Sequence, residues 1–410
     1  MVLPFCEGTE AAVPPLFCGR YADILSGMEV QEGAAMKLGI LCTMINGFGR
    51  RGYYNSQEVG LGRALAAMGH ELTIYKGIDP SEEEEKVVVV PGLVVWYLPM
   101  RHLGAHGWMP VSALDAETKA LFCFGDQQLF LPHIYRWCKR HGAAFVPYIG
   151  TAHSLNDGPK GRLMNILFET GTLRIYKNNP VLAKTSAAKA ELEALGVERI
   201  TVAPVGLDTS VLKQDFRSVD RDALRREHGY APEDVVLCNV SRLSPEKRPL
   251  ELIDLFLKIR GKKPFKLIIV GNGTLENALK EKIHFNGLEQ EVTLYENVPY
   301  PEMWKIYCMS DYYVNMNKGE IFGMAIMEAV YYCTSVAAYR AIGPSVTLKD
   351  MKGHALCDDD DVIAQWLLAP YPSRQELEES AAKVARDFSW ERCARAFLDI
   401  VQNASNSDVK

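Results

Sequence analysis

Residues 311–329 read DYYVNMNKGEIFGMAIMEA and decide the fold. The stretch begins with a short apolar run at 311–315 that is typical of a buried strand. A polar loop follows, and an apolar helix is predicted to begin at Gly323. A strand joined to a helix in this order is the repeating unit of a parallel α/β sheet.

The same unit recurs on both sides of this stretch. In the second half we expect strands at 234–240, 265–270, 291–295 and 311–315, with helices at 249–259, from 275 and at 303–309. In the first half we expect strands at 36–42, 71–75, 87–98, 120–124, 145–149 and 180–183, with helices at 59–65 and 129–141. Proline and glycine interrupt the pattern at 203–208, so the sequence predicts two α/β units joined there.

The chain of 410 residues is long for a single hydrophobic core, which also favours two domains. We expect a loose extension over 1–35, a first Rossmann-like domain over 36–205 and a second over 206–375. A final helix is expected over 376–410, interrupted near 388–390 and crossing back to the first domain.

Composition excludes several classes of protein. A net charge of -6 gives no general attraction for nucleic acid. The ten cysteines contain no Cys-x-x-Cys pair and lie mostly in apolar runs, which indicates buried thiols and not a zinc or disulfide framework. No apolar run reaches the length of a membrane span, and the acidic, proline-broken start does not read as a signal peptide. We therefore expect a cytoplasmic protein.

Two carboxylates in the opening stretch are candidates for binding hydroxyl groups. Glu320 lies in the predicted loop, and Glu328 lies eight residues later in the predicted helix. Both can line one crevice, and Gly323 exposes free N–H groups at the helix start. Carboxylates accept hydrogen bonds from hydroxyls, which sugar and ribose rings offer.

Cations are predicted at the end of a neighbouring strand. Arg242 and Lys247 follow the strand at 234–240 and precede a helix, where positive charge suits a diphosphate. Glycine turns after strands occur at 46–52 and at 271–273. Such turns let backbone N–H groups approach a ligand, although a plain tight turn is an equal alternative.

Together these residues resemble the retaining GT-B glycosyltransferases, most closely glycosyltransferase family 4. The hallmark Glu-x-Phe-Gly with a second glutamate matches residues 320–328. SRLSPEKR at 241–248, PVGLD at 204–208 and FSW at 388–390 match three further elements of the family. The likeness covers residues 36–402; it departs at 333–337, where CTSVA replaces the usual Gly-x-Pro-Val-Val.

The resemblance implies a GT-B fold, an α/β architecture in which two Rossmann-like domains with parallel sheets face each other across a central cleft. It also implies roles for individual residues. Arg242 and Lys247 would neutralise the donor diphosphate, Glu320 would meet hydroxyls of the transferred sugar, and Glu328 would hold the ribose. Phe322, Gly323 and Met324 would supply backbone contacts to the sugar and phosphate, and Gly271 and the segment Tyr295–Val298 would flank the base. Gly49 or Gly52 would lie near the diphosphate, and His153 would lie beside the donor sugar.

We accordingly expect a retaining hexosyltransferase that acts in the synthesis of polysaccharide, glycolipid or glycoconjugate. Its co-substrate would be a nucleotide-diphosphate sugar, with a UDP-sugar favoured and GDP- and ADP-sugars left open. No metal or other cofactor is expected. Two alternatives stay open: a sugar-nucleotide epimerase of the same fold, and a non-catalytic transferase-like subunit.

The acceptor is expected on the first domain. Residues 131–190 hold nine Lys or Arg against two acids. This excess would suit a phosphorylated or lipid-linked acceptor or an anionic membrane surface. Basic residues spread over separate helices would give the same count. Saccharide, glycolipid and lipid-linked acceptors therefore stay open, as does peripheral contact with the inner face of the membrane.

Overall fold

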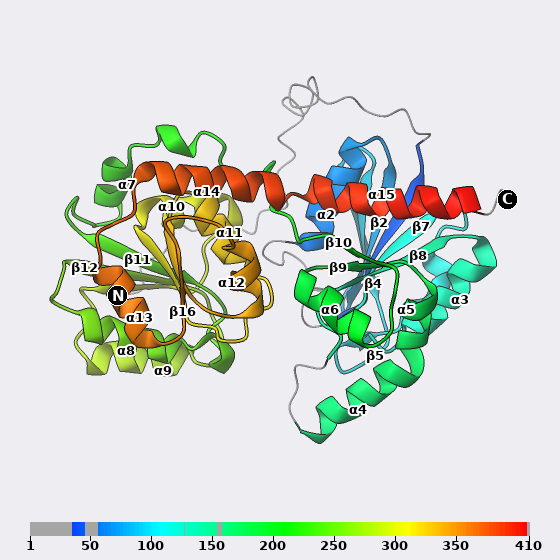
Figure 1. The fold of residues 1–410 in the computed structure, drawn as a ribbon, viewed down its shortest axis with the longest axis horizontal. Helices are drawn as coiled ribbons and strands as arrows, with labels where there is room; N and C mark the ends of the chain where they lie inside the picture. Colours follow the sequence, from blue (N-terminus) through cyan, green and yellow to red (C-terminus); the bar gives the residue numbers. More distant parts are fainter. Residues whose placement is uncertain (1–34, 46–55, 127, 154–157, 408–410) are drawn as a thin grey trace.

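The computed structural model describes residues 35–45, 56–126, 128–153 and 158–407. They form two α/β lobes that lie side by side (Figure 1). The expected extension at 1–35 and the glycines of the first turn, Gly49 and Gly52, lie outside the described residues, apart from residue 35 itself.

The first lobe is built on an eight-stranded sheet with the order β10-β9-β8-β7-β1-β2-β4-β3. Its strands are β1 (Lys37–Cys42), β2 (Glu71–Ile78), β3 (Glu85–Val90), β4 (Leu93–Pro99), β7 (Ala120–Phe124), β8 (Ala144–Ile149), β9 (Val181–Ala183) and β10 (Ile200–Val202). A separate ribbon pairs β5 (His102–Leu103) with β6 (His106–Gly107). The helices of this lobe are α2 (Gln57–Ala67), α3 (Leu131–His141), α4 (Pro159–Leu167), α5 (Leu173–Asn178) and α6 (Ser186–Ala194).

The second lobe is built on a six-stranded parallel sheet with the order β13-β12-β11-β14-β15-β16. Its strands are β11 (Val235–Val240), β12 (Phe265–Val270), β13 (Val292–Tyr295), β14 (Tyr312–Asn315), β15 (Ser335–Tyr339) and β16 (Ala355–Cys357). Its helices are α7 (Arg221–Glu227), α8 (Pro249–Ile259), α9 (Glu276–Phe285), α10 (Met303–Met309), α11 (Met324–Tyr331), α12 (Ile342–Thr347), α13 (Asp360–Leu368) and α14 (Arg374–Asp387).

Each sheet has a point at which the strand order reverses direction. In the first sheet the chain winds outward from β1 through β2 and returns to the other side of β1 at β7. In the second sheet the same reversal separates β11 from β14. Helices on either side of such a point diverge, so a crevice opens at the carboxyl ends of the strands, where ligands bind in open α/β sheets.

Most predicted elements are confirmed, and one is wrong in detail. The strand material expected at 87–98 is a hairpin in which β3 runs antiparallel to β4, so the first sheet is parallel only up to its edge strand. The final helical segment is interrupted where expected and forms two helices. The first, α14, packs on α11 of the second lobe, and α15 (Trp390–Ser407) packs on α2 of the first lobe.

The chain crosses between the lobes twice, at the same place. Residues 388–389 join α14 to α15, which lie nearly end to end across the two lobes in Figure 1. The N–H of Leu207 donates to the carbonyl of Phe388 at 2.8 Å. A Cβ on Gly206 would overlap the backbone nitrogen of Trp390, and a Cβ on Gly60 would overlap its indole ring. Glycine is therefore required where both crossings meet.

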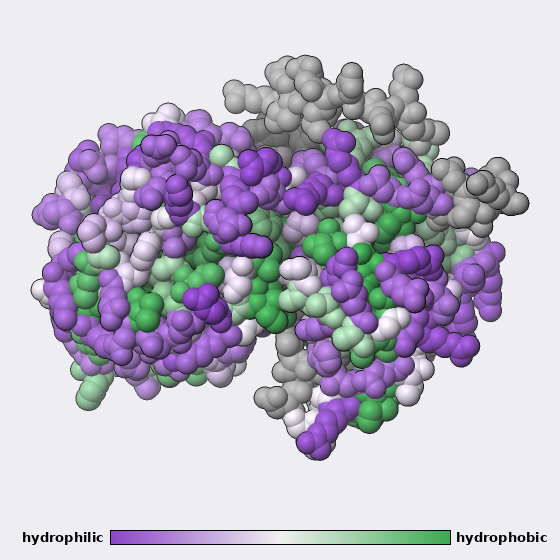
Figure 2. All heavy atoms as spheres, viewed as in Figure 1, coloured by the Kyte–Doolittle hydropathy of each residue, from purple (hydrophilic) through white to green (hydrophobic). Residues whose placement is uncertain are grey.

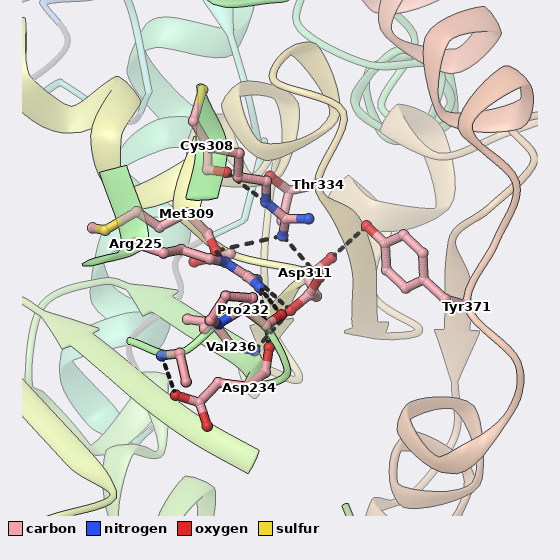
Figure 3. Close-up of polar contacts among 12 residues, drawn as sticks. Arg225, Pro232, Asp234, Val236, Cys308, Met309, Asp311, Thr334 and Tyr371 are labelled. Carbon is pink, nitrogen blue, oxygen red and sulfur yellow. Dashed lines mark hydrogen bonds and ion pairs between the residues drawn. The ribbon is translucent and has the colours of Figure 1, made fainter. Parts of the chain in front are cut away.

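A cluster of polar contacts supports the amino-end edge of the second sheet, which is opposite the crevice (Figure 3). Asp311 precedes β14 and accepts hydrogen bonds from Arg221 at 2.7 Å and from Arg225 at 2.6 Å. Its Oδ2 also accepts from the N–H of Val236 at 2.8 Å, and the hydroxyl of Tyr371 donates to its carbonyl at 3.0 Å. Because these contacts lie at the amino ends of β11 and β14, they hold the two strands on either side of the crevice.

The cysteines of the described residues are unpaired, and all but one are buried. Burial raises the pKa of Cys238 and of Cys393 to about 12. These thiols behave as small core side chains, as predicted.

Candidate functional site

The centre of the predicted donor site is an ion pair between the two sides of the second crevice. Lys247 follows β11 and Glu320 follows β14, and Lys247 Nζ lies 2.8 Å from Glu320 Oε2. Their side chains keep exposed fractions of 20% and 14%. The structure therefore brings together two predicted residues that are 73 positions apart in sequence.

The Glu320 loop is held from both sides. Asn317 Nδ2 donates to Glu320 Oε2 at 3.1 Å, and the N–H of Gly343 donates to the Glu320 carbonyl at 2.8 Å. A Cβ on Gly343 would overlap the backbone of Phe322, so the start of α12 presses directly on this loop. The carboxylate is thus oriented before any ligand arrives.

Gly323 turns the chain into α11. Its φ is +87°, in the left-handed region where glycine is favoured, and it caps the helix that begins with Met324. Phe322 points into the core and packs against Phe388 at 6.0 Å between ring centroids. The side chain of Phe322 is therefore structural, and only backbone groups of this turn are placed to meet a ligand.

Glu328 is completely buried within α11. Tyr307 donates its hydroxyl to Glu328 Oε2 at 2.7 Å. Burial raises the pKa of Tyr313 well above its usual value, and the charges of Glu320 and Glu328 raise it further. Tyr313 therefore lies near both carboxylates, and the expectation that they line one crevice stays a prediction. The ribose role of Glu328 stays a prediction.

Arg242 lies on the same loop as Lys247 and is well exposed. Its guanidinium is 3.3 Å from Glu246 Oε1, a pair that exposure to solvent makes weak. An exposed arginine on a short loop can turn toward an incoming phosphate at small cost, so this geometry is compatible with the predicted role.

Gly271 ends β12 beside this loop. Its φ is +149°, and a Cβ there would overlap the carbonyl oxygen of Ser241. Its N–H donates to the carbonyl of Tyr295 at 2.9 Å. The side chains of Tyr295 and Val298 are buried. Only the backbone groups of these residues would therefore flank the base in the predicted arrangement.

His153 lies on the loop after β8 in the first lobe. Its ring is exposed, and Nδ1 is 3.3 Å from Glu191 Oε2. The loop is at the carboxyl edge of the first sheet, as the resemblance implies, and the donor-sugar role stays a prediction.

Two ion pairs at that same edge were missed by sequence reasoning. Lys184 follows β9, and its Nζ lies 2.7 Å from Asp126 Oδ2. Lys76 on β2 lies 2.7 Å from Glu58 Oε1 on α2, with exposed fractions of only 2% and 1%. Asp126 follows the predicted strand at 120–124. A carboxylate at the carboxyl end of a strand was the one sequence signal for a site residue here. Nothing local pairs it with a lysine 58 residues later.

The basic residues of segment 131–190 differ in their surroundings. Lys184 is buried and paired with Asp126, while Arg136 and Lys139 are exposed on α3 and Arg174 is exposed on α5. Lys184 therefore does not add to the positive charge that this segment offers a partner, and the predicted anionic acceptor or membrane contact stays a prediction.

Two sequence families match the chain. Residues 59–211 match the family described as Glycosyltransferase Family 4, and residues 220–387 match Glycosyl transferases group 1. The matched ranges correspond to the two lobes, and the second contains both Lys247 and Glu320.

The chain belongs to glycosyltransferase family 4. This glycosyltransferase is 23% identical over 402 residues to the D-inositol 3-phosphate glycosyltransferase of Jonesia denitrificans, covering 87% of this chain and 92% of the relative. It is 27% identical over 396 residues to the protein of the same name from Mycobacterium avium, covering 86% and 89%. The epimerase and non-catalytic readings receive no support from these matches.

Solved structures share the fold of the glycosyltransferase. Sucrose-phosphate synthase from Thermosynechococcus elongatus is similar with a TM-score of 0.70 and 15% identity, covering 91% of this chain and all of that one. Anabaena HepE in complex with UDP and glucose is similar with a TM-score of 0.60 and 15% identity, covering 90% and 100%. The GT-B fold predicted from the sequence is confirmed.

Proposed function

We propose that this glycosyltransferase transfers a hexose from a nucleotide-diphosphate sugar to an acceptor hydroxyl with retention of anomeric configuration and without a metal ion. The observation that carries the proposal is the Lys247–Glu320 pair at the reversal point of the second sheet. It sets a cation and a hydroxyl-binding carboxylate side by side, which matches a sugar linked to a diphosphate.

In this proposal the leaving group is stabilised by fixed positive charge. Departure of the nucleoside diphosphate develops negative charge on its terminal phosphate. Lys247, Arg242 and the N–H groups at the start of α11 would meet that charge, an electrostatic contribution that needs no reorganisation during the step. These groups do the work that a divalent cation does elsewhere, which supports the metal-free form.

Glu320 would orient the sugar. Its carboxylate is held by Lys247 and Asn317 and would accept hydrogen bonds from sugar hydroxyls. Retention would follow if the acceptor attacks from the face that the diphosphate leaves, with a phosphate oxygen taking the proton of the acceptor hydroxyl. UDP-sugars are the first choice of donor because the HepE structure holds UDP and glucose.

A donor screen tests the proposal. We would measure the melting temperature with UDP-, GDP- and ADP-sugars, since a ligand that binds only the folded state raises stability by RT ln(1 + [L]/Kd). The expected result is a shift with one nucleotide class and transfer that persists in EDTA. The stereochemistry of the product is then read by NMR. Loss of transfer in EDTA, or an inverted product, would contradict the corresponding part of the proposal.

A saccharide, glycolipid or lipid-linked acceptor is proposed, and α4 supports contact with a membrane. Within the part of the chain that the structure describes, no helix is long and apolar enough to cross a membrane. On α4, however, Leu163, Ile166 and Leu167 are exposed at the spacing of one helix face. Arg162 is exposed beside them, and Figure 2 shows apolar atoms next to hydrophilic ones in this region. Apolar side chains beside a cation favour an anionic lipid surface.

Vesicle co-sedimentation tests this contact. Binding to vesicles containing phosphatidylglycerol should exceed binding to phosphatidylcholine vesicles. It should fall when Leu163 and Ile166 are both replaced by glutamine. Phe285→Gln is the matched control, because Phe285 is the most exposed of the large apolar side chains and lies on α9 of the other lobe. Equal binding by all three proteins would remove the membrane proposal.

A further inference from the structure

The burial of Glu328 conflicts with the ribose role predicted for it unless a neighbouring group can move. Glu328 is completely buried within α11, so no ligand can reach its carboxylate in the packing described above. Several tyrosine side chains lie close to this carboxylate, and their different packing indicates which of them can be displaced. They are Tyr300, Tyr307, Tyr313 and Tyr332.

Three of these tyrosines are fixed in the core of the second lobe. Tyr307 donates its hydroxyl to Glu328 Oε2 at 2.7 Å, and its ring stacks on that of Tyr332 at 5.7 Å between centroids. The hydroxyls of Tyr313 and Tyr332 are hydrogen-bonded to backbone groups. All three residues are at most 5% exposed. Displacing any of them would disrupt close packing, so they belong to the fold.

Tyr300 differs from the other three in its position and its packing. It begins a short 3₁₀ turn, Tyr300–Glu302, that continues directly into α10, the helix that carries Tyr307. Positions seven residues apart lie on nearly the same face of a helix, so Tyr300 and Tyr307 both approach Glu328 from this side. Tyr300 is only half-buried, although its hydroxyl oxygen is completely buried. Its ring can therefore leave the site without opening the core.

The Tyr300 hydroxyl interacts with the Glu328 carboxylate. Burial raises the pKa of Tyr300 well above its usual value, and the negative charge of Glu328 raises it further, with a smaller effect of Asp208. The hydroxyl therefore stays protonated and is available as a donor to the carboxylate. A ribose ring would offer Glu328 the same kind of donor.

We propose that the Tyr300 hydroxyl holds the place on Glu328 that a ribose hydroxyl of the donor takes, and that nucleotide binding turns this side chain away. Pro299 and Pro301 flank Tyr300 and restrict its backbone, so the motion is a rotation of the side chain. Tyr300 is then a positioning residue that acts through Glu328. It lowers the affinity for the nucleotide, because binding requires a conformation in which Glu328 has been released. This inference rests on the proposed function, since it takes the ligand to be the nucleotide of the donor.

Nucleotide binding by two matched variants tests the proposal. Calorimetric titration with UDP, GDP and ADP would compare wild type with Tyr300→Phe and Tyr307→Phe, which each remove one hydroxyl beside Glu328 and keep the ring. We expect the nucleotide that binds wild type to bind Tyr300→Phe roughly three- to tenfold more tightly. Tyr307→Phe should bind it no more tightly than wild type, because the Tyr307 hydroxyl is not displaced. Unchanged or weaker binding by Tyr300→Phe, or an equal gain in both variants, would overturn the proposal.

The gain in affinity should depend on the ribose hydroxyls. The 2′,3′-dideoxy form of the same nucleotide has no ribose hydroxyl to donate to Glu328. Tyr300→Phe should therefore bind the dideoxy nucleotide no more tightly than wild type does. A gain of the same size with the dideoxy nucleotide would mean that Tyr300 acts on some other contact, and the proposal would be wrong.

A spectroscopic measurement on the unsubstituted side chains covers the case in which Tyr300→Phe does not fold. Fluorine would be introduced as 3-fluorotyrosine at position 300 in one sample and at position 307 in another. A saturating concentration of the nucleotide should shift the fluorine NMR signal of Tyr300 and leave that of Tyr307 nearly in place. A Tyr300 signal that does not move at saturation would refute the displacement.

The outcomes separate this inference from the proposed function. If wild type binds a nucleotide and its dideoxy form equally well, the donor proposal stands, whereas the contact between Glu328 and the ribose is refuted and the role of Tyr300 with it. If UDP, GDP and ADP and their sugars bind none of the proteins, the donor proposal fails and this inference fails too.

Discussion

Replacing Lys247 by methionine tests the site most directly. The substitution keeps most of the aliphatic stem and removes the charge that lies 2.8 Å from Glu320. Glu320 then keeps only the amide of Asn317 as a side-chain donor among the contacts described above. The variant therefore perturbs both the stability of the loop and the charge available to a leaving diphosphate.

The two effects have different sizes. The pair is mostly but not fully buried, so we expect a loss of stability of about 1–3 kcal/mol, below the cost of breaking a fully buried pair. Removing one preorganised group that stabilises developing charge lowers kcat by roughly 10²–10³-fold, which corresponds to about 3–4 kcal/mol. Adding Glu320→Gln should recover part of the stability, because no charge is then left unpaired, and should recover none of the activity.

Urea unfolding and steady-state transfer measure the two effects separately. Lys258→Met is the control, because Lys258 on α8 pairs with Asp361 on α13 and both side chains are exposed. An exposed pair contributes about 0–1 kcal/mol, and activity should not change. A Lys247→Met enzyme with kcat within threefold of wild type would refute the catalytic assignment. A double variant that loses as much stability as the sum of the single variants would refute the pairing.

Three further outcomes follow from the packing. Burial lowers the pKa of His354 to about 4. Neutral His354 is therefore favoured by folding, and stability falls as pH drops below about 6.5; urea unfolding should show a loss of about 2 kcal/mol at pH 5 relative to pH 7 that His354→Gln does not show. Gly206→Ala should cost about 1–3 kcal/mol, because its Cβ overlaps the crossing between α14 and α15, whereas Gly171→Ala, with open space around it, should not lower the melting temperature. Tyr307→Phe removes a 2.7 Å hydrogen bond to buried Glu328 and should cost about 1–3 kcal/mol by calorimetry; an unchanged transition would mean that the contact contributes nothing.

Local patterns were enough to predict most of the fold. The helix at 249–259 and the strand at 265–270 have the expected bounds, because each is one apolar segment ended by proline, glycine or charged residues. The short strands β10, β15 and β16 and the small helices α12 and α13 were not predicted. Such elements carry too few residues to show a period, and contacts with their neighbours stabilise them.

The contact between Lys247 and Glu320 was predictable because both residues follow strands and form recognisable motifs. Lys247 and Glu320 were expected at one crevice, and the structure shows them in contact. The resemblance implies only backbone contacts for Phe322, and its packing against Phe388 then shows what no local pattern could, that its side chain belongs to the core.

Tertiary structure alone decided the chemistry of the first lobe. In the sequence, Lys184 is one of nine basic residues in a segment that suggests attraction for anions. In the fold, β9 brings Lys184 beside Asp126, and its charge is cancelled. A charge count records how many ionised groups a segment holds, but the field at a ligand depends on which of them are paired. That pairing is set by strand order, so residues 311–329 could identify the fold while the charge balance at the carboxyl edge of the first sheet had to come from the arrangement of its strands.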